Sequence, residues 1–491
     1  MSCVSWAASI ETATIYHNER FPTPLSQASI AAPPATINGL QITPESRRII
    51  FLTAGAAGMF CGSCMHDNAL AKALIAQGHD CILQPVYTPL RTDEVSVARE
   101  SVFFGGIQLY AIERFPWIRH LPAKLRRLLD APALIRMVTR QDRATDPKVL
   151  GELAVSMLQG HEGHHAAEVE RLTRWIVDDV QPDAIVLSNL LIGGSLPHIR
   201  AQLDRAGRSD VPIAVMLQGD DIFLDFLPEP FREKASTLCK SLVKYVDKFV
   251  TNSDFYSSKM GERFEIPLDK RAHLPLSIDT MPYQVLADGD LRSLESGELR
   301  SVDDFRIGYL ARISPDKGLH HLVDAFIHLA KDGEHENASL HVAGYLGAQY
   351  KPYFDNQLKR LRDAGLGDRF THHGELTLDQ KVSYLRSLDL LCVPTDYHDP
   401  KGLFVLEALA SGVPVLQPDH GAFGQLIRET GGGMVYESGN LEDLVCKIFE
   451  LKVDDQARRL LAEQGRISVM KNHSTTQVAA QLIDILFADK Q

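Results

Sequence analysis

Two cations and the start of a helix lie together in a short loop in the second half of the chain. Arg312 and Lys317 are five residues apart, between the apolar run 306–310 and Gly318, where a helical pattern begins. A guanidinium fork, a compact ammonium and the free amides of a helix N-terminus together suit a diphosphate. The spacing therefore predicts a diphosphate-binding loop. The alternative from the same residues is an ordinary solvated loop between a strand and a helix.

Two acids eight positions apart mark a second segment. Asp399 lies in a loop, and Glu407 lies near the start of an Ala- and Leu-rich helix that ends at Gly412. A carboxylate in that place can accept hydrogen bonds from two ribose hydroxyls, and the free amides of residues 401–404 can bind a phosphate or sugar oxygen. Taken alone, Glu407 is equally compatible with an ordinary capping acid.

These segments need strands and helices to position them, and apolar runs predict two series of such elements. The first series runs strand, Gly-rich turn, helix and strand, an order typical of a parallel sheet. Its strands are predicted at 48–53, 81–86, 183–187, 213–217 and 248–251, and those of the second series at 306–310, 339–343, 388–393 and 413–417. We therefore expect two doubly wound, Rossmann-like α/β domains. Ligands of such sheets bind beyond the carboxyl ends of the strands, so the site should lie in a cleft between the domains.

Composition changes along the chain predict where these domains begin and end. Residues 1–46 are rich in Ser, Thr, Ala and Pro without a helical or strand period, and we expect a loosely ordered leader there. The first domain is predicted at 47–287, a charged linker at 288–304 and the second domain at 305–470. A last helical stripe within 471–491 is expected to pack back on the first domain.

The overall composition excludes several classes of protein. A formal net charge of −12 argues against a nucleic-acid binder. The longest charge-free stretch, 21–44, is broken by prolines and is not a membrane span, and no signal-peptide pattern opens the chain, so we expect a cytoplasmic protein. The seven cysteines are scattered and odd in number, unlike a secreted disulfide framework. Cys61 and Cys64 have thioredoxin-like spacing, which indicates either redox or metal chemistry or a turn of small residues.

Together, the motifs of the second half resemble the retaining glycosyltransferases of family 4, which belong to the glycosyl transferases group 1 and have the GT-B fold. Order and spacing agree over roughly residues 305–450. The matching residues are Gly308, Arg312, Lys317-Gly318, Val342-Ala343-Gly344, His373-Gly374-Glu375-Leu376, Pro394-Thr395, Glu407 and the run from Ala410 to Val415. The first half matches more loosely, through 55–58, 251–253 and 276–279.

The resemblance implies a role for each matching residue. Arg312 and Lys317 would hold the diphosphate of a UDP- or GDP-sugar, and Glu407 would bind the ribose. The other implied contacts are Gly374 and Leu376 with the base, Asp399, Gly402 and Leu403 with the donor sugar, and Gly58 with the diphosphate from the first domain. The implied reaction moves the sugar to a hydroxyl of a glycan, lipid or small molecule, with retention of anomeric configuration and with no metal or other cofactor.

Three departures from the family pattern leave alternatives open. Asp399 stands where the family usually has Glu, and Lys401 stands where it usually has an aromatic residue, which suggests an acidic donor sugar. Gln218 stands where many members have a His, and an amide cannot carry a proton. The catalytic role would then pass to Asp220 or Asp221, or activity would be reduced. An alternative class is therefore a GT-B sensor or scaffold that binds nucleotide-sugar without turnover.

Two further segments suggest other partners. His161-Glu162-Gly163-His164-His165 spells the zinc-protease motif H-E-x-x-H, with His198 or Glu168 available as a third ligand, although glycine at 160 and 163 disfavours the helix that this motif needs. Residues 115–129 mix basic and apolar side chains in the first domain. They predict either peripheral contact with the inner face of a membrane or an ordinary surface helix.

Overall fold

A computed structural model of the chain describes residues 46–55, 62–88, 90, 92, 94–99, 102–103, 147–284, 304–331 and 337–488. Several predictions fall on residues outside these ranges. They concern nearly all of the leader 1–46, Gly58, Cys61, the segment 115–129 and all of the linker 288–304 except its last residue.

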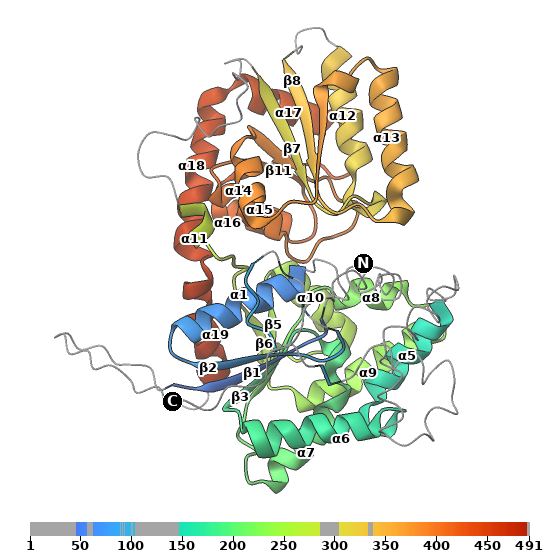
Figure 1. The fold of residues 1–491 in the computed structure, drawn as a ribbon, viewed down its shortest axis with the longest axis vertical. Coiled ribbons are helices and arrows are strands. Elements are labelled where there is room, and N and C mark those ends of the chain that lie inside the picture. The colour runs from blue at the N-terminus through green and yellow to red at the C-terminus, as the bar shows by residue number, and fades with distance from the viewer. Residues whose placement is uncertain are drawn as a thin grey trace, which may run out of the picture.

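Two six-stranded sheets, one in each half of the chain, form the frame of the structure (Figure 1). Every pair of neighbouring strands in both sheets is parallel. The first sheet has the order β2-β1-β3-β4-β5-β6. Its strands are β1 (Arg48–Thr53), β2 (Asp80–Pro85), β3 (Ala184–Leu187), β4 (Ile213–Met216), β5 (Lys248–Thr251) and β6 (Arg271–His273). The second sheet has the order β12-β11-β10-β7-β8-β9. Its strands are β7 (Phe305–Leu310), β8 (Ala338–Ala343), β9 (Phe370–Gly374), β10 (Leu390–Cys392), β11 (Val415–Pro418) and β12 (Gly433–Tyr436).

Helices cover both faces of each sheet. Those described in the first half are α1 (Gly62–Ala76), α5 (Pro147–Gln159), α6 (Ala166–Arg174), α7 (Leu196–Arg205), α8 (Asp220–Phe226), α9 (Phe231–Leu242), α10 (Asp254–Phe264) and α11 (Met281–Gln284). Those of the second half are α12 (Leu319–Lys331), α13 (Lys351–Asp363), α14 (Leu378–Arg386), α15 (Leu403–Ala410), α16 (Phe423–Thr430), α17 (Leu441–Val453), α18 (Asp455–Asn472) and α19 (Thr475–Phe487). Shorter turns of helix are η5 (Gly160–Glu162), η6 (Trp175–Val180), η7 (Leu190–Ser195), η8 (Val243–Tyr245), η9 (Leu268–Lys270), η10 (Pro315–Lys317), η11 (Ala348–Tyr350) and η12 (Gly367–Arg369). None of the helices in the described ranges combines the length and the apolar character that a bilayer crossing requires.

The predicted pair of doubly wound domains is confirmed, and the reason lies in the burial of the strands. All residues of β3, β4 and β10 are buried, as parallel strands covered by helices on both faces must be. Such strands appear in the sequence as continuous apolar runs. The three strands missed by the sequence analysis, β6, β9 and β12, are all at sheet edges and carry partly exposed residues, so their sequences lack such a run.

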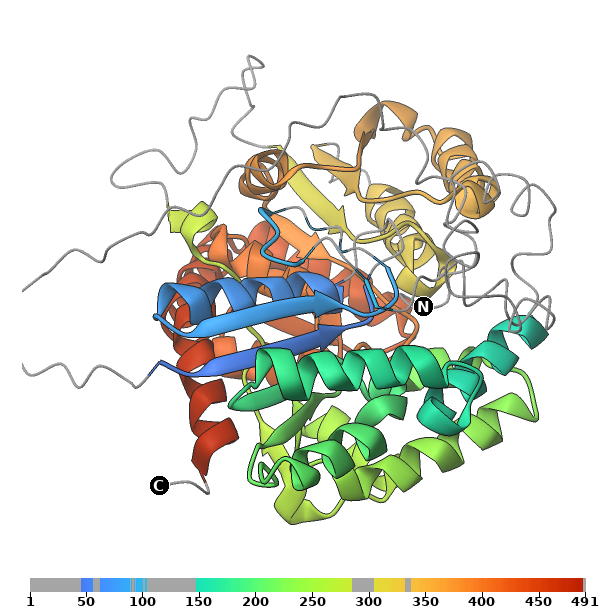
Figure 2. The ribbon, with the colours of Figure 1, turned by 60° about the horizontal axis from the view of Figure 1, so that its bottom comes forward.

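The last two helices connect the two halves of the molecule. α18 lies on the second domain, and α19 packs against α1 of the first domain (Figure 2). Val478, Leu482 and Phe487 of α19 share an apolar cluster with Phe51 and Leu70. At the crossing point, the amide of Ile278 donates to the carbonyl of His473 at 3.0 Å, so the main chains of the two segments are tied directly. The far end of the chain is therefore part of the first domain's core.

Replacing Leu482 tests this attachment. Its side chain is fully buried in the cluster between α19 and α1. We expect Leu482→Ala to lower the free energy of unfolding by about 2–5 kcal/mol, through lost burial and the cavity left behind. Urea unfolding measures this loss. Asp484→Ala, on the exposed side of the same helix, should change stability by no more than about 0.5 kcal/mol. Equal losses for the two variants would show that α19 is not docked as described.

Candidate active site

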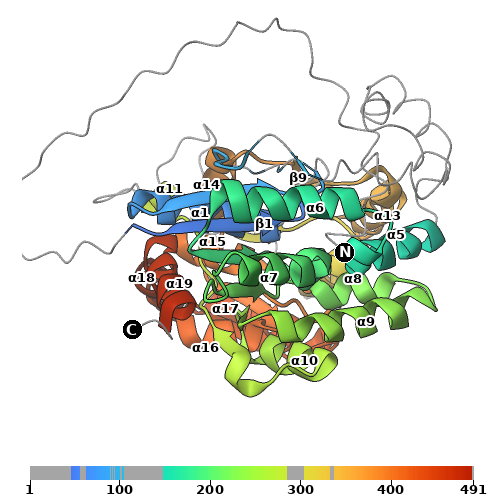
Figure 3. The same cartoon turned by 90° about the horizontal axis from the view of Figure 1, so that it is seen from below.

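A cavity of 290 Å³ lies between the carboxyl ends of the two sheets. The first domain contributes the start of α1 and the loop after β4, while the second contributes the loops after β7, β8, β9 and β10. Figure 3 views the molecule from below, so that α6 and α7 of the first domain, which lie on the side away from the second domain, are toward the viewer. The lining residues include Gly62, Ser63, Gln218, Arg312, Lys317, Leu376, Lys381, Tyr397, Asp399, Lys401, Gly402, Leu403 and Glu407. A larger groove of 1020 Å³ along α18 is lined by Ser411, Gly412 and Pro414 of the motif run but by none of the residues expected to contact the donor, so the smaller cavity is the candidate site.

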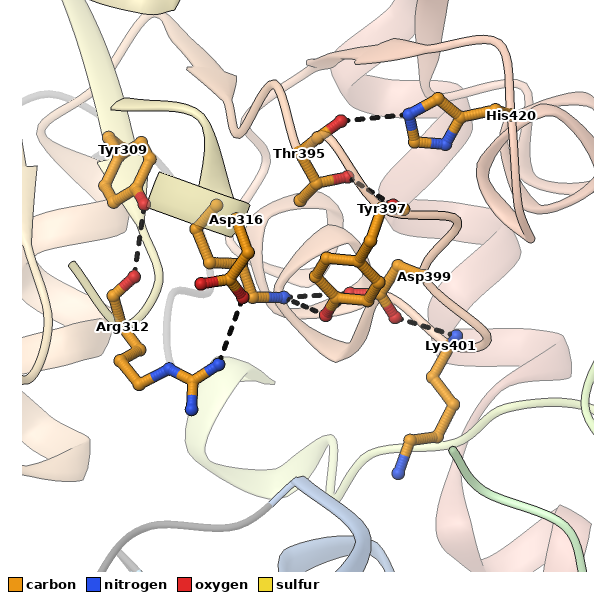
Figure 4. Close-up of polar contacts among 9 residues, drawn as sticks. Tyr309, Arg312, Asp316, Thr395, Tyr397, Asp399, Lys401 and His420 are labelled. Carbon is orange, nitrogen blue, oxygen red and sulfur yellow. Dashed lines mark hydrogen bonds and ion pairs between the residues drawn. The ribbon is translucent and has the colours of Figure 1, made fainter. Parts of the chain in front are cut away.

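An ion pair between a largely buried lysine and a buried aspartate joins the two loops that carry the predicted cations and the first predicted acid. Lys317 Nζ lies 2.9 Å from Asp399 Oδ2 and 2.5 Å from the hydroxyl of Tyr397. The Tyr397 hydroxyl in turn donates to Asp399 Oδ2 at 2.8 Å (Figure 4). Gly318 makes this approach possible. It has φ +70°, and a Cβ there would lie 1.6 Å from the carbonyl oxygen of Pro394.

Asp399 is ionised in this setting. Burial alone would raise the pKa of its carboxyl, but Lys317, the amide of Lys401 and the Tyr397 hydroxyl outweigh it and lower that pKa to about 2. The Lys401 amide donates to Asp399 Oδ1 at 3.0 Å. Both carboxylate oxygens therefore have partners, and the group is a fixed negative anchor for the Lys317 ammonium.

Arg312 extends the positive wall of the cavity. Its Nη2 lies 3.2 Å from Asp316 Oδ2, and its carbonyl accepts a hydrogen bond from the Tyr309 hydroxyl at 3.2 Å. The buried Nε of Arg312 has no hydrogen-bond partner within the described part of the chain. Buried N–H groups nearly always have a partner, and an anionic oxygen in the cavity would supply one.

Glu407 faces the same cavity from α15. Its Oε1 lies 2.5 Å from Nζ of Lys381, which comes from α14, and both side chains are buried. Gly402, with φ +84°, is the N-cap of α15, and Gly402 and Leu403 both line the cavity. Lys381 was missed by the sequence analysis, because nothing in a separation of 26 residues marks it as a partner of Glu407.

The residues expected to contact the base divide into two groups. Leu376 and its neighbour Glu375 line the cavity. Gly374 is absent from the lining. Its carbonyl accepts from the amide of Gly344 at 2.8 Å, at the end of β9. Gly374 thus holds the β8 and β9 loops together, and Leu376 is the residue of this pair that faces the cavity.

This architecture has counterparts among known proteins. Residues 294–468 match the family model "Glycosyl transferases group 1". Most of the second domain is therefore similar to this family. The chain is 32% identical over 247 residues to the lipopolysaccharide core biosynthesis mannosyltransferase LpsB of Rhizobium meliloti, a match that covers 49% of this chain and 65% of that protein. It is 25% identical over 244 residues to a GDP-mannose-dependent α-(1-6)-phosphatidylinositol monomannoside mannosyltransferase of Mycobacterium tuberculosis, covering 48% of this chain and 61% of that protein. The matches therefore span less than two thirds of each relative.

Solved structures extend the likeness to both domains of the fold. Sucrose-phosphate synthase from Thermosynechococcus elongatus superposes with a TM-score of 0.63 at 17% identity, over 90% of this chain and 100% of the other. Anabaena HepE, in complex with UDP, superposes with a TM-score of 0.59 at 14% identity, again over 90% and 100% of the two chains. At such identities the comparison concerns the fold, and the predicted GT-B architecture is confirmed.

Opposite the second domain, the first domain presents a polar wall. Lys401 Nζ crosses the cleft to Ser63 Oγ at 2.7 Å and Gln218 Oε1 at 3.3 Å. Figure 4 shows its side chain running away from Asp399, toward the first domain. Gln218 is fixed in turn, because its Nε2 donates to Asp67 Oδ1 at 2.9 Å. The departures at Lys401 and Gln218 are therefore in contact with each other.

Asp220, which was expected to take a catalytic role, does not face the cavity. Its carboxylate accepts from the amides of Leu190 at 2.7 Å and Gln218 at 3.1 Å, and the residue does not line the cavity. Burial raises its pKa to about 6, although the two backbone hydrogen bonds oppose that rise. The neighbouring Asp221 is bound by Lys259 and the Tyr256 hydroxyl, each at 2.6 Å. Asp220 therefore shapes the loop that presents Gln218.

The zinc-protease interpretation of His161 to His165 is wrong. A short 3-10 turn carries His161 and Glu162 and ends at Gly163, whose backbone is extended, and α6 begins only after His165. The two histidines thus do not share one face of an α-helix, as that motif requires. His165 is buried at the start of α6, while His161 is exposed. Of the two cysteines with thioredoxin-like spacing, only Cys64 lies within the described residues, and it is a buried residue of α1.

Acid titration tests the ion pair of Asp399. We expect Asp399→Asn to lower the free energy of unfolding near neutral pH by about 3–5 kcal/mol, because it leaves the buried Lys317 ammonium without its carboxylate. The carboxyl pKa is about 2 in the folded state and about 3.9 in the unfolded state. The stabilisation is therefore complete above about pH 4 and is lost as the pH falls toward 2.

The measurement is urea unfolding of wild type and variant over that pH range. The difference between the two proteins should be constant at higher pH and should shrink by about 2–3 kcal/mol on acidification. Asp363→Asn, which alters an exposed pair with Lys359, is the control and should show neither effect. A difference between wild type and Asp399→Asn that does not change with pH would contradict the assignment.

Proposed function

We propose that this protein is a glycosyltransferase that moves a sugar from a nucleotide-diphosphate donor to an acceptor hydroxyl, with retention of configuration and without a metal ion. The observation that carries the proposal is that Arg312 and Lys317 from one loop and Glu407 from α15 line one cavity between the carboxyl ends of two sheets. The match of residues 294–468 to the model "Glycosyl transferases group 1" supports it independently.

In the proposed reaction, the bond between the anomeric carbon and a phosphate oxygen breaks as the acceptor oxygen bonds to the same carbon. Negative charge grows on the departing diphosphate, beside Arg312 and Lys317. Fixed donors of this kind stabilise the transition state more than the ground state. The proton of the acceptor hydroxyl passes to the departing phosphate oxygen. Leaving and entering groups then share one face of the sugar, which gives retention, and no protein base is required.

The donor and acceptor classes follow from the relatives. One relative is named as GDP-mannose-dependent, and one solved neighbour is a complex with UDP. A UDP- or GDP-sugar is therefore the proposed donor. The two mannosyltransferase relatives are named for a phosphatidylinositol monomannoside and for the lipopolysaccharide core. We propose a glycan or lipid-linked hydroxyl as the acceptor.

Substitution of the cations and the ribose acid separates catalysis from donor binding. We expect Arg312→Ala to reduce kcat about 10²–10³-fold, because one preorganised donor to the leaving group is lost. Glu407→Gln removes the charge that accepts the ribose hydroxyls, so the Kd for UDP or GDP should rise with a smaller change in kcat. Thermal shift with both nucleotides selects the donor base. Turnover is then measured in EDTA, and the anomeric configuration of the first product is identified by NMR.

Two exposed residues provide matched controls for these variants. Arg459→Ala and Glu450→Gln change the same residue types far from the cavity and should retain wild-type kinetics. Donor binding that is sensitive to Glu407→Gln but accompanied by no turnover with any sugar would favour the alternative, a nucleotide-sugar sensor. A product of inverted configuration, or a requirement for added Mg²⁺ or Mn²⁺, would sink the corresponding part of the proposal.

Because of Lys401, we propose that the protein prefers an acidic donor sugar. Its main-chain amide binds the carboxylate that is expected to meet the donor sugar, and its ammonium is at the cavity wall, in contact with Ser63 and Gln218. A uronic acid donor would bring its own carboxylate to this ammonium. We expect UDP-glucuronate to be used at least about tenfold better than UDP-glucose in kcat/KM, and Lys401→Met to abolish that ratio. Lys359→Met, an exposed lysine, is the control. Equal use of both donors by the wild type would contradict the preference.

A further inference from the structure

Three metal-binding side chains meet on the first domain, outside the donor cavity. They are His161 from η5, Glu170 from α6 and His198 from α7. One ligand atom from each lies within 4.8 Å of the other two. His198 Nε2 is 2.7 Å from Glu170 Oε2, and the rings of His161 and His198 stack with centroids 4.7 Å apart and planes 10° apart. The cluster therefore joins η5, α6 and α7, although η6, β3 and η7 lie between α6 and α7 in the chain.

We propose that these three residues form a binding site for one divalent transition-metal ion of the zinc type. Two imidazoles and one carboxylate are ligands that suit zinc, cobalt and nickel, whereas magnesium and calcium prefer oxygen alone. Zinc bonds of about 2.0–2.1 Å place tetrahedral ligand atoms about 3.3 Å apart. The contact between His198 and Glu170 must open by about half an ångström to admit such an ion. The exposed His161 must turn out of its stacked position so that its lone pair points at the same centre.

The backbone holds the cluster together through glycine contacts. Gly160, directly before His161, has φ +58°, and a Cβ at this position would lie 1.8 Å from the carbonyl oxygen of Gly194. A Cβ on Gly194 would meet the carbonyl of Met157 at 1.9 Å. Only this pair of glycines lets η5 approach the segment that leads into α7, and the approach places His161 beside His198.

The carboxylate has a partner that orients it. Arg174, one turn further along α6, donates to Glu170 Oε1 at 3.0 Å. The other oxygen, Oε2, is the one that faces His198. A ligating carboxylate is commonly held by such an outer hydrogen bond. The ion would thus be bound by His161, His198 and one oxygen of Glu170, with water at any remaining position.

A second histidine cluster in the described chain is less suited to a metal. In the group of His320, His321 and Asp396, the two histidines are adjacent in sequence. His320 Nδ1 is 2.9 Å from the Tyr353 hydroxyl, and its Nε2 is 3.9 Å from Asp396. This second cluster provides an internal control for the experiment.

The site is expected to stabilise the first domain and to leave sugar transfer unchanged. None of its three ligands lines the donor cavity. An ion bound by η5, α6 and α7 only in the folded state raises the melting temperature by mass action. Metal binding is thus independent of the proposed glycosyltransferase activity, and the failure of either proposal leaves the other standing.

The test uses the full-length, untagged protein after EDTA treatment and removal of the chelator. Cobalt is titrated while its visible absorption is followed, and zinc is titrated by calorimetry. We expect one tight equivalent, and a rise in melting temperature with zinc. His161→Ala, Glu170→Gln and His198→Ala should each weaken zinc binding by at least about tenfold and remove the thermal shift. Glu170→Gln keeps the size of the side chain, so it guards against a loss caused by misfolding.

Two control variants distinguish this site from other histidines. His164→Ala alters an exposed neighbour, and His321→Ala alters the second cluster, and both should bind zinc as the wild type does. The proposal is overturned if no equivalent binds, if all variants bind alike, or if His321→Ala abolishes binding while His198→Ala does not.

Discussion

The cavity between the domains depends on the largely buried pair of Lys317 and Asp399. The two residues belong to different loops of the second domain, 82 positions apart, and each loop follows a buried central strand. Taking both charges out of water is unfavourable, and their close contact together with the Tyr397 hydroxyl offsets that loss. The pair therefore fixes the two loops relative to each other. Arg312 in one loop and the first turn of α15 after the other then face the same space.

A diphosphate entering this space would meet charges that are already arranged. Lys317 is held by its carboxylate and cannot relax toward the solvent. Arg312 retains a buried N–H that the described chain leaves unsatisfied. Groups fixed in advance need little reorganisation when charge develops on a leaving group, which is why they stabilise a transition state well. The same rigidity makes the site sensitive to Asp399, although that residue is shorter than the glutamate usual in the family.

Much of this arrangement could be predicted from the sequence, because it depends on local order along the chain. Strand β1 was predicted with its observed bounds, and the motif residues Arg312, Lys317, Asp399 and Glu407 all line the cavity. The partners that neutralise or orient them could not be predicted. Lys381 and Tyr397 act through contacts that only the fold creates, and no spacing rule specifies them.

The same contrast between local sequence order and contacts that only the fold creates explains two predictions that differ from the structure. Asp220 follows a buried strand at the correct edge of the sheet, so its sequence position resembles that of a catalytic acid. Its side chain instead accepts hydrogen bonds from two backbone amides, and the left-handed turn at Gly219 directly precedes it. The histidines at 161 and 165 have the spacing of a helical pair, but Gly163 breaks the helix. His161 instead meets His198, a residue 37 positions away.

The chemistry at the centre of the cleft is consistent with the absence of a histidine at position 218. The Gln218 amide cannot carry a proton. Burial, and to a lesser extent the nearby charge of Lys401, lowers the pKa of His66 to about 3, so this ring is neutral. Neither group can serve as a base with a pKa near neutrality. The proposed same-face reaction would need none, because the departing phosphate oxygen would take the proton of the entering hydroxyl. What the first domain must supply is a fixed polar wall, and the contacts among Ser63, Gln218 and Lys401 provide it across the cleft.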